Sequence, residues 1–253
     1  MENKIEFKVY GKYALFTDPL TRIGGEKCSY QIPTYQAVKG IVESIYWKPT
    51  LVWVIDKMRI VKPIRTQTRS AKPLNYGGIY PSTHTSGKKE EPFNSLSIYT
   101  YLADVEYQVQ AHFEWNDHRP DMEKDRNENK HFFIAQRMID RGGRRDIFLG
   151  TRECQGYVEP CNFGEEVGFY DNYGQLDFGL MFHGFDYPDE TGVNELHARF
   201  WRPRMIDGFV QFDRPEECGI RKFVRKMTAY SLESTGFAED GLLDGYVEVV
   251  GQP

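Results

Sequence analysis

Lys130 and His131 are adjacent residues of a kind that can carry out chemistry on a phosphate group. They lie near the start of a helix predicted over residues 127–143, which Asn127 can cap and Gly142-Gly143 can end. A histidine with an ordinary pKa of about 6.5 transfers protons at neutral pH, and a lysine holds negative charge. A polyanion fits this segment better than a small metabolite, because it continues with Arg137, Arg141, Arg144 and Arg145.

The helical spacing divides this predicted helix into two faces. One is an apolar stripe that would pack on a sheet, made of Phe132, Ile134, Ala135, Met138 and Ile139. Lys130, Arg137 and Arg141 share the flank beside it and form a positive row suited to a phosphate backbone. His131 falls inside the apolar stripe. Spacing alone therefore leaves two interpretations open, a packed histidine with a satisfied hydrogen bond or a first-turn histidine that faces a cleft.

If His131 faces a cleft, RNA is the substrate that needs the least additional machinery. RNA carries its own nucleophile, the 2′-hydroxyl beside the scissile phosphate, so cleavage requires only proton transfer and charge stabilisation, without a metal. Lys130 could hold the developing negative charge. Tyr46, at the end of the first predicted helix, could donate a hydrogen bond to the phosphate or the 2′-oxygen. A packed aromatic beside Trp47 is the more common role of a lone tyrosine, and this alternative also stays open.

The charge of the chain is unevenly distributed. The formal net charge is -5, which by itself disfavours nucleic acid. Residues 57–72 nevertheless hold only basic charged residues, and further basic groups occupy 137–152, 199–204 and 221–226. Each group alone is consistent with an ordinary solvated surface, but together they favour a polyanion partner. The predicted RNA-binding residues are Lys57, Arg59, Lys62, Arg65, Arg69, Arg137, Arg141, Arg144 and Arg145.

Several other functions are disfavoured by missing motifs. The sequence has no phosphate-binding glycine loop, dinucleotide fingerprint, zinc-peptidase motif or hydrolase nucleophile elbow, and it lacks the base-stacking consensus of RNA-recognition domains. The four cysteines form no C-x-x-C pair, so we expect free thiols, no metal site and no cofactor. No apolar run approaches the roughly 20 residues that cross a bilayer, and the first residues resemble no signal peptide. These features predict a soluble, cytoplasmic protein that does not contact membranes.

The order of the predicted elements indicates the fold. We expect strands at 5–16, 51–65, 97–115 and 146–150, helices at about 33–48 and 127–143, and a long loop at 70–94. This β-α-β-β-α-β order is that of the ferredoxin-like or RRM-like α+β fold. Beyond Gly164 the chain is rich in glycine and aromatic residues, which predicts a smaller antiparallel β region. We therefore expect an RRM-like domain over 1–160 and an antiparallel β domain over 161–253.

Several stretches spread over the chain resemble one known family. They are GKYALFTDP (11–19), SYQIPTYQAVKGI (29–41), NENKH (127–131), RRDIFLGTRECQGYV (144–158) and FWRP (200–203). On these residues the chain resembles the fifth family of CRISPR-associated proteins in its subtype I-C form, within the RAMP superfamily. The stretch 144–158 is the most distinctive.

The resemblance implies an activity and a set of catalytic residues. The family cleaves the CRISPR precursor transcript at the base of the repeat hairpin without a metal, leaving a 2′,3′-cyclic phosphate and a 5′-hydroxyl. Its catalytic tyrosine and Lys-His pair correspond here to Tyr46, Lys130 and His131. The product would stay bound by its 5′ handle, and the protein would join the backbone and large subunits of a type I-C Cascade complex.

Two alternatives to this endoribonuclease come from other functional classes. A non-catalytic subunit would only hold the RNA handle and dock onto neighbouring proteins, as relatives in other subtypes do. The presence of Tyr46, Lys130 and His131 together favours the enzyme, because a scaffold needs none of them. A metal-dependent nuclease is disfavoured, because the carboxylates are scattered along the sequence.

Overall fold

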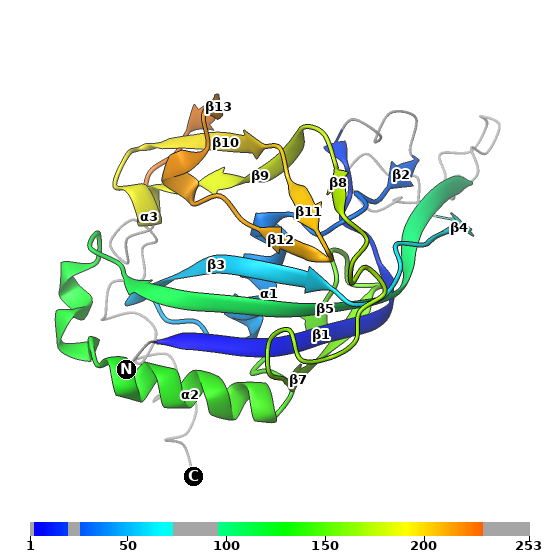
Figure 1. Cartoon of the computed structure of the whole chain (residues 1–253). Coiled ribbons are helices and arrows are strands. Elements are labelled where there is room, and N and C mark those ends of the chain that lie inside the picture. The colour runs from blue at the N-terminus through cyan, green and yellow to red at the C-terminus, as the bar shows by residue number, and fades with distance from the viewer. Residues whose placement is uncertain (1–2, 20–25, 73–95, 230–253) are drawn as a thin grey trace, which may run out of the picture.

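Strand β5 (Ser97–Trp115) lies at the centre of the fold in the computed structural model, which describes residues 3–19, 26–72 and 96–229. It pairs with β1 (Lys4–Ala14) on one side and with β3 (Leu51–Ile60) on the other, and both pairings are antiparallel. A further strand, β7 (Gln155–Pro160), lies on the outer side of β1. The resulting order β7-β1-β5-β3, with one helix after β1 and another after β5, confirms the predicted ferredoxin-like α+β class (Figure 1).

The strands form here because their side chains alternate between core and surface. Buried and less buried residues alternate from Lys4 to Val9 in β1, which places Phe7 and Val9 in the core. Trp53 of β3 lies opposite Phe113 of β5 in the register, and both side chains are fully or almost fully buried. Burial of these large apolar side chains fixes the register, since a slip by one residue would turn them to the other face.

Two helices carry the residues of interest. Helix α1 (Tyr35–Ile45) begins at Thr34, whose hydroxyl accepts a hydrogen bond from the Ala37 amide at 3.1 Å. Helix α2 (Glu128–Asp140) begins at Asn127, whose side chain accepts from the Lys130 amide at 3.0 Å. The predicted cap at Asn127 is confirmed. The helix ends before Gly142 and Gly143, which both have positive φ angles.

The strand predicted over 146–150 differs from the observed one. The chain forms only the short strand β6 (Ile147–Phe148) there, which pairs with the start of β7. The strand that pairs with β1 is β7, and it lay outside the predicted range. Two short strands joined by a tight turn give too little alternation for the sequence to separate them.

The strand predicted over 51–65 is also divided. It ends at Ile60, and the chain then forms β4 (Thr66–Ala71), which pairs antiparallel with residues 97–102 of β5. The short strand β2 (Lys27–Cys28) pairs with β5 in parallel. Most of the long loop predicted over 70–94 lies outside the described residues.

The described residues beyond Gly164 form six strands, as expected for a β region. Three short strands, β8 (Gln175–Asp177), β11 (Arg204–Ile206) and β12 (Phe209–Gln211), extend the large sheet beyond β3. The other three, β9 (Met181–Asp186), β10 (Glu195–Trp201) and β13 (Ile220–Lys226), form a separate antiparallel sheet. The division into domains at residue 160 stays a prediction, and strands from both sides of that position contribute to the large sheet.

The described residues also form three short helical elements. They are η3 (Pro120–Asp125), between β5 and α2, α3 (Pro188–Thr191), between β9 and β10, and η4 (Pro215–Glu217), between β12 and β13. Figure 1 shows η3 in the connection between the end of β5 and the start of α2. Within the described part of the chain, no helix is long and apolar enough to span a membrane.

Two glycines provide a matched test of this backbone. Gly150 has φ +95°, and a Cβ atom there would lie 2.0 Å from the Leu15 carbonyl oxygen, whereas a Cβ at Gly40 in α1 would meet nothing within 4 Å. We expect Gly150→Ala to lower the free energy of unfolding by about 2 kcal/mol or more. Gly40→Ala should raise it by about 0.5–1 kcal/mol, because alanine is the better helix former. Urea denaturation of both variants measures the difference, and equal effects would contradict the observed backbone.

Candidate active site

The fold brings Tyr46 and His131 into contact, although they are 85 residues apart in the chain. Tyr46 ends α1 and is 3% exposed, and its carbonyl oxygen accepts a 2.7 Å hydrogen bond from the Trp53 indole N–H. Its hydroxyl oxygen lies 2.7 Å from Nδ1 of His131 in the first turn of α2. Two of the three predicted catalytic residues therefore touch, and Lys130 is the chain neighbour of one of them.

His131 is fully buried, and both of its ring nitrogens are bonded. Nε2 lies 2.8 Å from the backbone carbonyl oxygen of Asp125. A carbonyl can only accept, so Nε2 carries a hydrogen and donates it to Asp125. In the tautomer with a hydrogen on Nε2 alone, Nδ1 accepts from the Tyr46 hydroxyl. The rings of Phe113 and Trp115 lie edge-on to the imidazole, with centroids 6.2 and 5.8 Å away. The packed-histidine interpretation thus describes its surroundings in this structure, and its catalytic role stays a prediction.

Lys130 lies beside this pair at the protein surface. Its side chain is 48% exposed, and its ammonium group pairs with the Asp125 carboxylate. The same carboxylate accepts a 2.9 Å hydrogen bond from the hydroxyl of Thr50, a fully buried residue. Asp125 therefore contacts Lys130 through its side chain and His131 through its backbone.

Asp125 was not identified from the sequence as a site residue. It belongs to the acidic segment 116–125, which looked only like a connection between β5 and α2. Asp125 lies two residues before the α2 cap at Asn127, and this position is at most a weak indication of a site residue. Its contact with His131 is made by a backbone carbonyl, which no side-chain pattern reveals.

Burial and neighbouring groups shift the pKa values of Tyr46 and Asp125. Burial raises the pKa of Tyr46 above its ordinary value, and the Asp125 carboxylate raises it further, while Arg144 lowers it. Tyr46 is therefore a neutral hydrogen-bond donor at neutral pH. Hydrogen bonds from Lys130 and then from Thr50 lower the pKa of the Asp125 carboxyl, which keeps it ionised.

The basic turn after α2, which carries Arg144 and Arg145, lies against the end of α1. The amide groups of Arg144 and Arg145 donate to the carbonyl oxygens of Ile45 and Ser44 at 3.2 and 3.0 Å, at the end of α1. This turn lines a surface hollow of about 530 Å³ together with residues 155–157. The four predicted RNA-binding residues of this part are all exposed: Arg137, Arg141, Arg144 and Arg145.

The predicted RNA-binding residues of β3, β4 and the segment between these strands differ from one another in exposure. Arg59 is 3% exposed, and its Nη2 donates to both carboxylate oxygens of Asp171 at 2.7 and 3.0 Å. Its guanidinium group therefore already has a partner inside the fold. Lys62 is half-buried and pairs with Asp104 and Glu106 at 2.8 and 3.4 Å. The remaining three are exposed: Lys57, Arg65 and Arg69.

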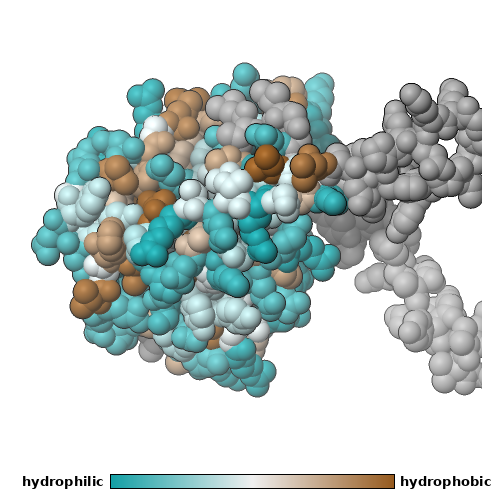
Figure 2. All heavy atoms as spheres, turned by 90° about the vertical axis from the view of Figure 1, so that its right-hand side faces the viewer, coloured by the Kyte–Doolittle hydropathy of each residue, from teal (hydrophilic) through white to brown (hydrophobic). Residues whose placement is uncertain are grey.

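The two basic groups lie on separate parts of the molecule, because β4 pairs with the right-hand end of β5 whereas α2 runs below the sheet along β1 and β7 (Figure 1). Figure 2 shows the side of the molecule that carries β4. Its visible described residues are mostly hydrophilic, with scattered hydrophobic side chains between them. RNA binding by the β3–β4 group stays a prediction.

The arrangement of metal-binding residue types gives no candidate metal centre. Among the described residues, no three or more His, Cys, Asp or Glu side chains are grouped as metal ligands would be. Cys154 and Cys218 are buried free thiols, and Cys161 is a half-buried one. Cys28 is half-buried, and its thiol donates to the Ser29 carbonyl oxygen at 3.6 Å.

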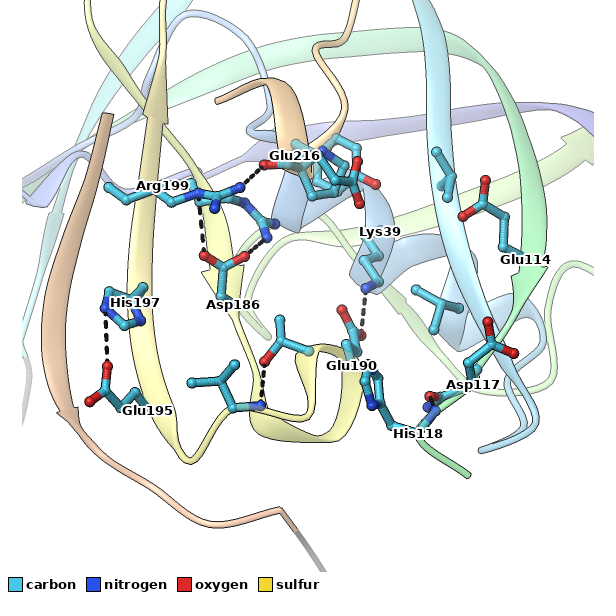
Figure 3. A pocket seen from close by; sticks show the side chains of 18 of the residues that line it. Lys39, Glu114, Asp117, His118, Asp186, Glu190, Glu195, His197, Arg199 and Glu216 are labelled. Atoms are coloured by element: carbon cyan, nitrogen blue, oxygen red, sulfur yellow. Dashed lines mark hydrogen bonds and ion pairs between the residues drawn. The ribbon is translucent and has the colours of Figure 1, made fainter. Parts of the chain in front are cut away.

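A cavity of about 660 Å³ lies between β10, β13, α3 and the end of β5 (Figure 3). Two of its cations, Lys39 and Arg199, are buried and paired with Glu190 and Asp186. The third, Arg221, is exposed and lies 3.7 Å from Asp186. It is rich in carboxylates, namely Glu114, Asp117, Asp186, Glu190, Glu195 and Glu216. This charge repels a polyanion, and the residues that line the cavity include neither Tyr46 nor His131. We therefore place the candidate site at the Tyr46–His131 contact.

Comparison with known proteins gives one consistent result. The Cas5d model of a family described as CRISPR-associated protein (Cas_Cas5) matches residues 4–213. The CRISPR pre-crRNA endoribonuclease Cas5d of Mannheimia succiniciproducens is 31% identical over 225 residues, covering 83% of this chain and 95% of the relative. The protein of the same name from Thermus thermophilus is 28% identical over 201 residues, covering 79% and 80%. A crystal structure of a CRISPR-associated protein matches with 32% identity and a TM-score of 0.67, covering 87% and 97%.

The Tyr46–His131 hydrogen bond should contribute to stability as well as to any chemistry. Tyr46→Phe leaves Nδ1 of the buried His131 without a partner, which should lower the free energy of unfolding by about 1–3 kcal/mol. Tyr157→Phe is the control, because that side chain is 52% exposed and its loss of a hydroxyl should change stability by less than about 0.5 kcal/mol. Chemical denaturation compares them, and equal changes would show that the buried contact is not formed in solution.

Proposed function

The chain belongs to the Cas5d family of CRISPR-associated proteins, and from this membership we propose that it is the endoribonuclease that processes precursor crRNA. It cleaves at the base of the repeat hairpin and then stays bound to the 5′ handle. In that state it serves as a subunit of a type I-C Cascade complex in antiviral defence, in contact with the backbone and large subunits.

The contact between Tyr46 and His131 beside Lys130 carries this proposal. It supplies a proton-transfer pair and a cation on adjacent surfaces of α1 and α2. The relatives from Mannheimia succiniciproducens and Thermus thermophilus bear the name pre-crRNA endoribonuclease. A non-catalytic subunit that only holds the RNA handle would not need this triad, so the enzyme is the better supported function.

The proposed reaction needs no metal and no external nucleophile. The 2′-oxygen attacks the neighbouring phosphorus and loses its proton, and the bond from phosphorus to the 5′-oxygen breaks. The 5′-oxygen then gains a proton, so the products are a 2′,3′-cyclic phosphate and a 5′-hydroxyl. Tyr46 and His131 handle these protons, and Lys130 neutralises the charge on the phosphate.

The RNA backbone follows the basic surface from the turn after α2 to Lys130. The exposed residues Arg144 and Arg145 lie beside the end of α1, and Tyr46 is the residue that ends this helix. Arg59 is left out of this surface, because its guanidinium group is buried against Asp171. Phosphate contacts of this kind set the position and the affinity of the RNA rather than its sequence.

The enzyme should cleave its own repeat RNA in the presence of EDTA. His131→Ala should abolish cleavage, a loss of at least about 100-fold because general acid–base catalysis contributes that much, while RNA binding is retained. An end-labelled repeat RNA on a denaturing gel measures cleavage, and a filter-binding assay measures affinity. Treating the products with acid and then phosphatase identifies the cyclic phosphate.

Two results would contradict this function in different ways. If the wild type cleaves none of several repeat RNAs, the chain is a handle-binding subunit. If EDTA stops the reaction, the protein cleaves RNA by another mechanism.

The RNA path predicts a specific loss of affinity. The double variant Arg144→Gln/Arg145→Gln should weaken binding of the repeat RNA and lower the slope of log affinity against log salt by about 1–2, as expected when two phosphate contacts are lost. Arg204→Gln is the control, because Arg204 is exposed on β11 and pairs with Asp177. An equal loss in both variants would mean that the turn after α2 is not a specific part of the path.

A further inference from the structure

The turn η3 covers the most buried member of the candidate site without being buried itself. None of its residues, 120–125, is buried, yet its last residue places a carbonyl oxygen 2.8 Å from Nε2 of the fully buried His131. An exposed turn with few core contacts opens at a lower free-energy cost than a helix or a central strand. Moving it would uncover His131 without disturbing α1 or α2.

The side chain of Asp125 is what holds this turn in place. Its carboxylate pairs with Lys130 and accepts a 2.9 Å hydrogen bond from Thr50, and one of its oxygens lies 3.5 Å from Nε2 of His131. The segments on either side are anchored independently. Arg126 donates to the Asn116 carbonyl oxygen at 2.9 Å, and the Asn116 amide donates to the Thr50 carbonyl oxygen at the same distance.

The carboxylate and a substrate phosphate compete for the same cation. A phosphodiester carries one negative charge and oxygen acceptors, as a carboxylate does, and Lys130 is the ammonium group exposed beside His131. A phosphate that binds Lys130 competes with the Asp125 carboxylate, because two anions beside one ammonium group repel each other. The Asp125 carboxylate then loses its ion pair with Lys130, and the Nε2–H group of His131 becomes available to the RNA.

We propose that Asp125 is a positioning residue that keeps the site closed in the absence of RNA, and that the substrate phosphate opens the site by taking the place of its carboxylate on Lys130. The inference rests on the proposed cleavage of RNA at this site. It makes binding of a phosphate and exposure of the catalytic histidine a single event. RNA affinity is reduced in proportion to the fraction of molecules that are closed.

Binding of an uncleavable RNA tests the competition. The probe is the repeat RNA with 2′-fluoro groups in place of every 2′-hydroxyl, in about 0.15 M salt, where the Debye length is about 8 Å. We expect Asp125→Asn to bind it about ten-fold or more tightly than the wild type. Glu128→Gln is the matched control, because Glu128 is exposed in the first turn of α2 and its substitution makes the same change in charge. It should tighten binding by less than about three-fold.

Chemical modification tests whether His131 becomes exposed. Diethyl pyrocarbonate modifies accessible histidines, and mass mapping of peptides separates the sites. His131 should be protected in the wild type and modified in Asp125→Asn. His183, which is also 0% exposed but lies in β9, is the internal control and should stay protected in both proteins.

A second variant tests the same contact without a change of charge. It also keeps the test available if Asp125→Asn does not fold. Thr50→Val deletes the other attachment of the carboxylate without changing any charge. It should shift RNA affinity and His131 modification in the same direction, by a smaller factor. The RNA concentration at half-maximal cleavage should fall in Asp125→Asn by a larger factor than any change in the cleavage rate at saturation.

The inference is overturned if Asp125→Asn binds RNA no more tightly than Glu128→Gln, or if His131 stays protected in it. A fall of more than about ten-fold in the saturating rate would also overturn it, because Asp125 would then act in the reaction itself. A failure of the proposed function looks different. In that case the wild type does not cleave natural RNA, whereas the binding and modification results with the uncleavable RNA are unaffected.

Discussion

The pairing of β5 on both of its edges is the constraint on which the rest of the structure depends. This strand holds β1 on one side and β3 on the other, in registers fixed by buried side chains. The end of α1 meets β3 through the hydrogen bond from Trp53 to the Tyr46 carbonyl. The connection out of β5 leads through η3 into α2. Because α1 is held against β3 and α2 follows β5, the pairing of these two strands brings Tyr46 and His131 together.

Long periodic elements could be predicted from the sequence, and contacts between elements could not. Strand 97–115 and the cap of α2 at Asn127 follow from local patterns, and the structure confirms both. Arg59 lies in a strand, so its local pattern allowed an exposed position. Its partner Asp171 is 112 residues away, and only the folded chain brings the two together. The Tyr46–His131 contact depends on tertiary structure in the same way.

The burial of His131 has to be reconciled with a role in catalysis. A buried histidine whose two nitrogens are both bonded costs little to keep in the core, so burial alone indicates neither catalysis nor its absence. The identity of its partners is more informative. One is a tyrosine hydroxyl on a rigid helix end, and the other is a backbone carbonyl on an exposed turn. The partner that must be displaced is therefore on the element that moves most easily.

The difference between the end of α1 and the exposed turn η3 also affects which RNA is cleaved under the proposed mechanism. A ribonuclease that needs no metal and no external nucleophile has little in its chemistry to restrict it to one RNA. A site that stays closed until a phosphate reaches Lys130 adds a requirement of geometry, because the same RNA must lie on the basic turn after α2 and reach the start of that helix. Under the proposed opening, RNA that contacts only one of these places would leave His131 covered. Positioning of the repeat, rather than recognition of the scissile bond, would then determine which transcripts are cleaved.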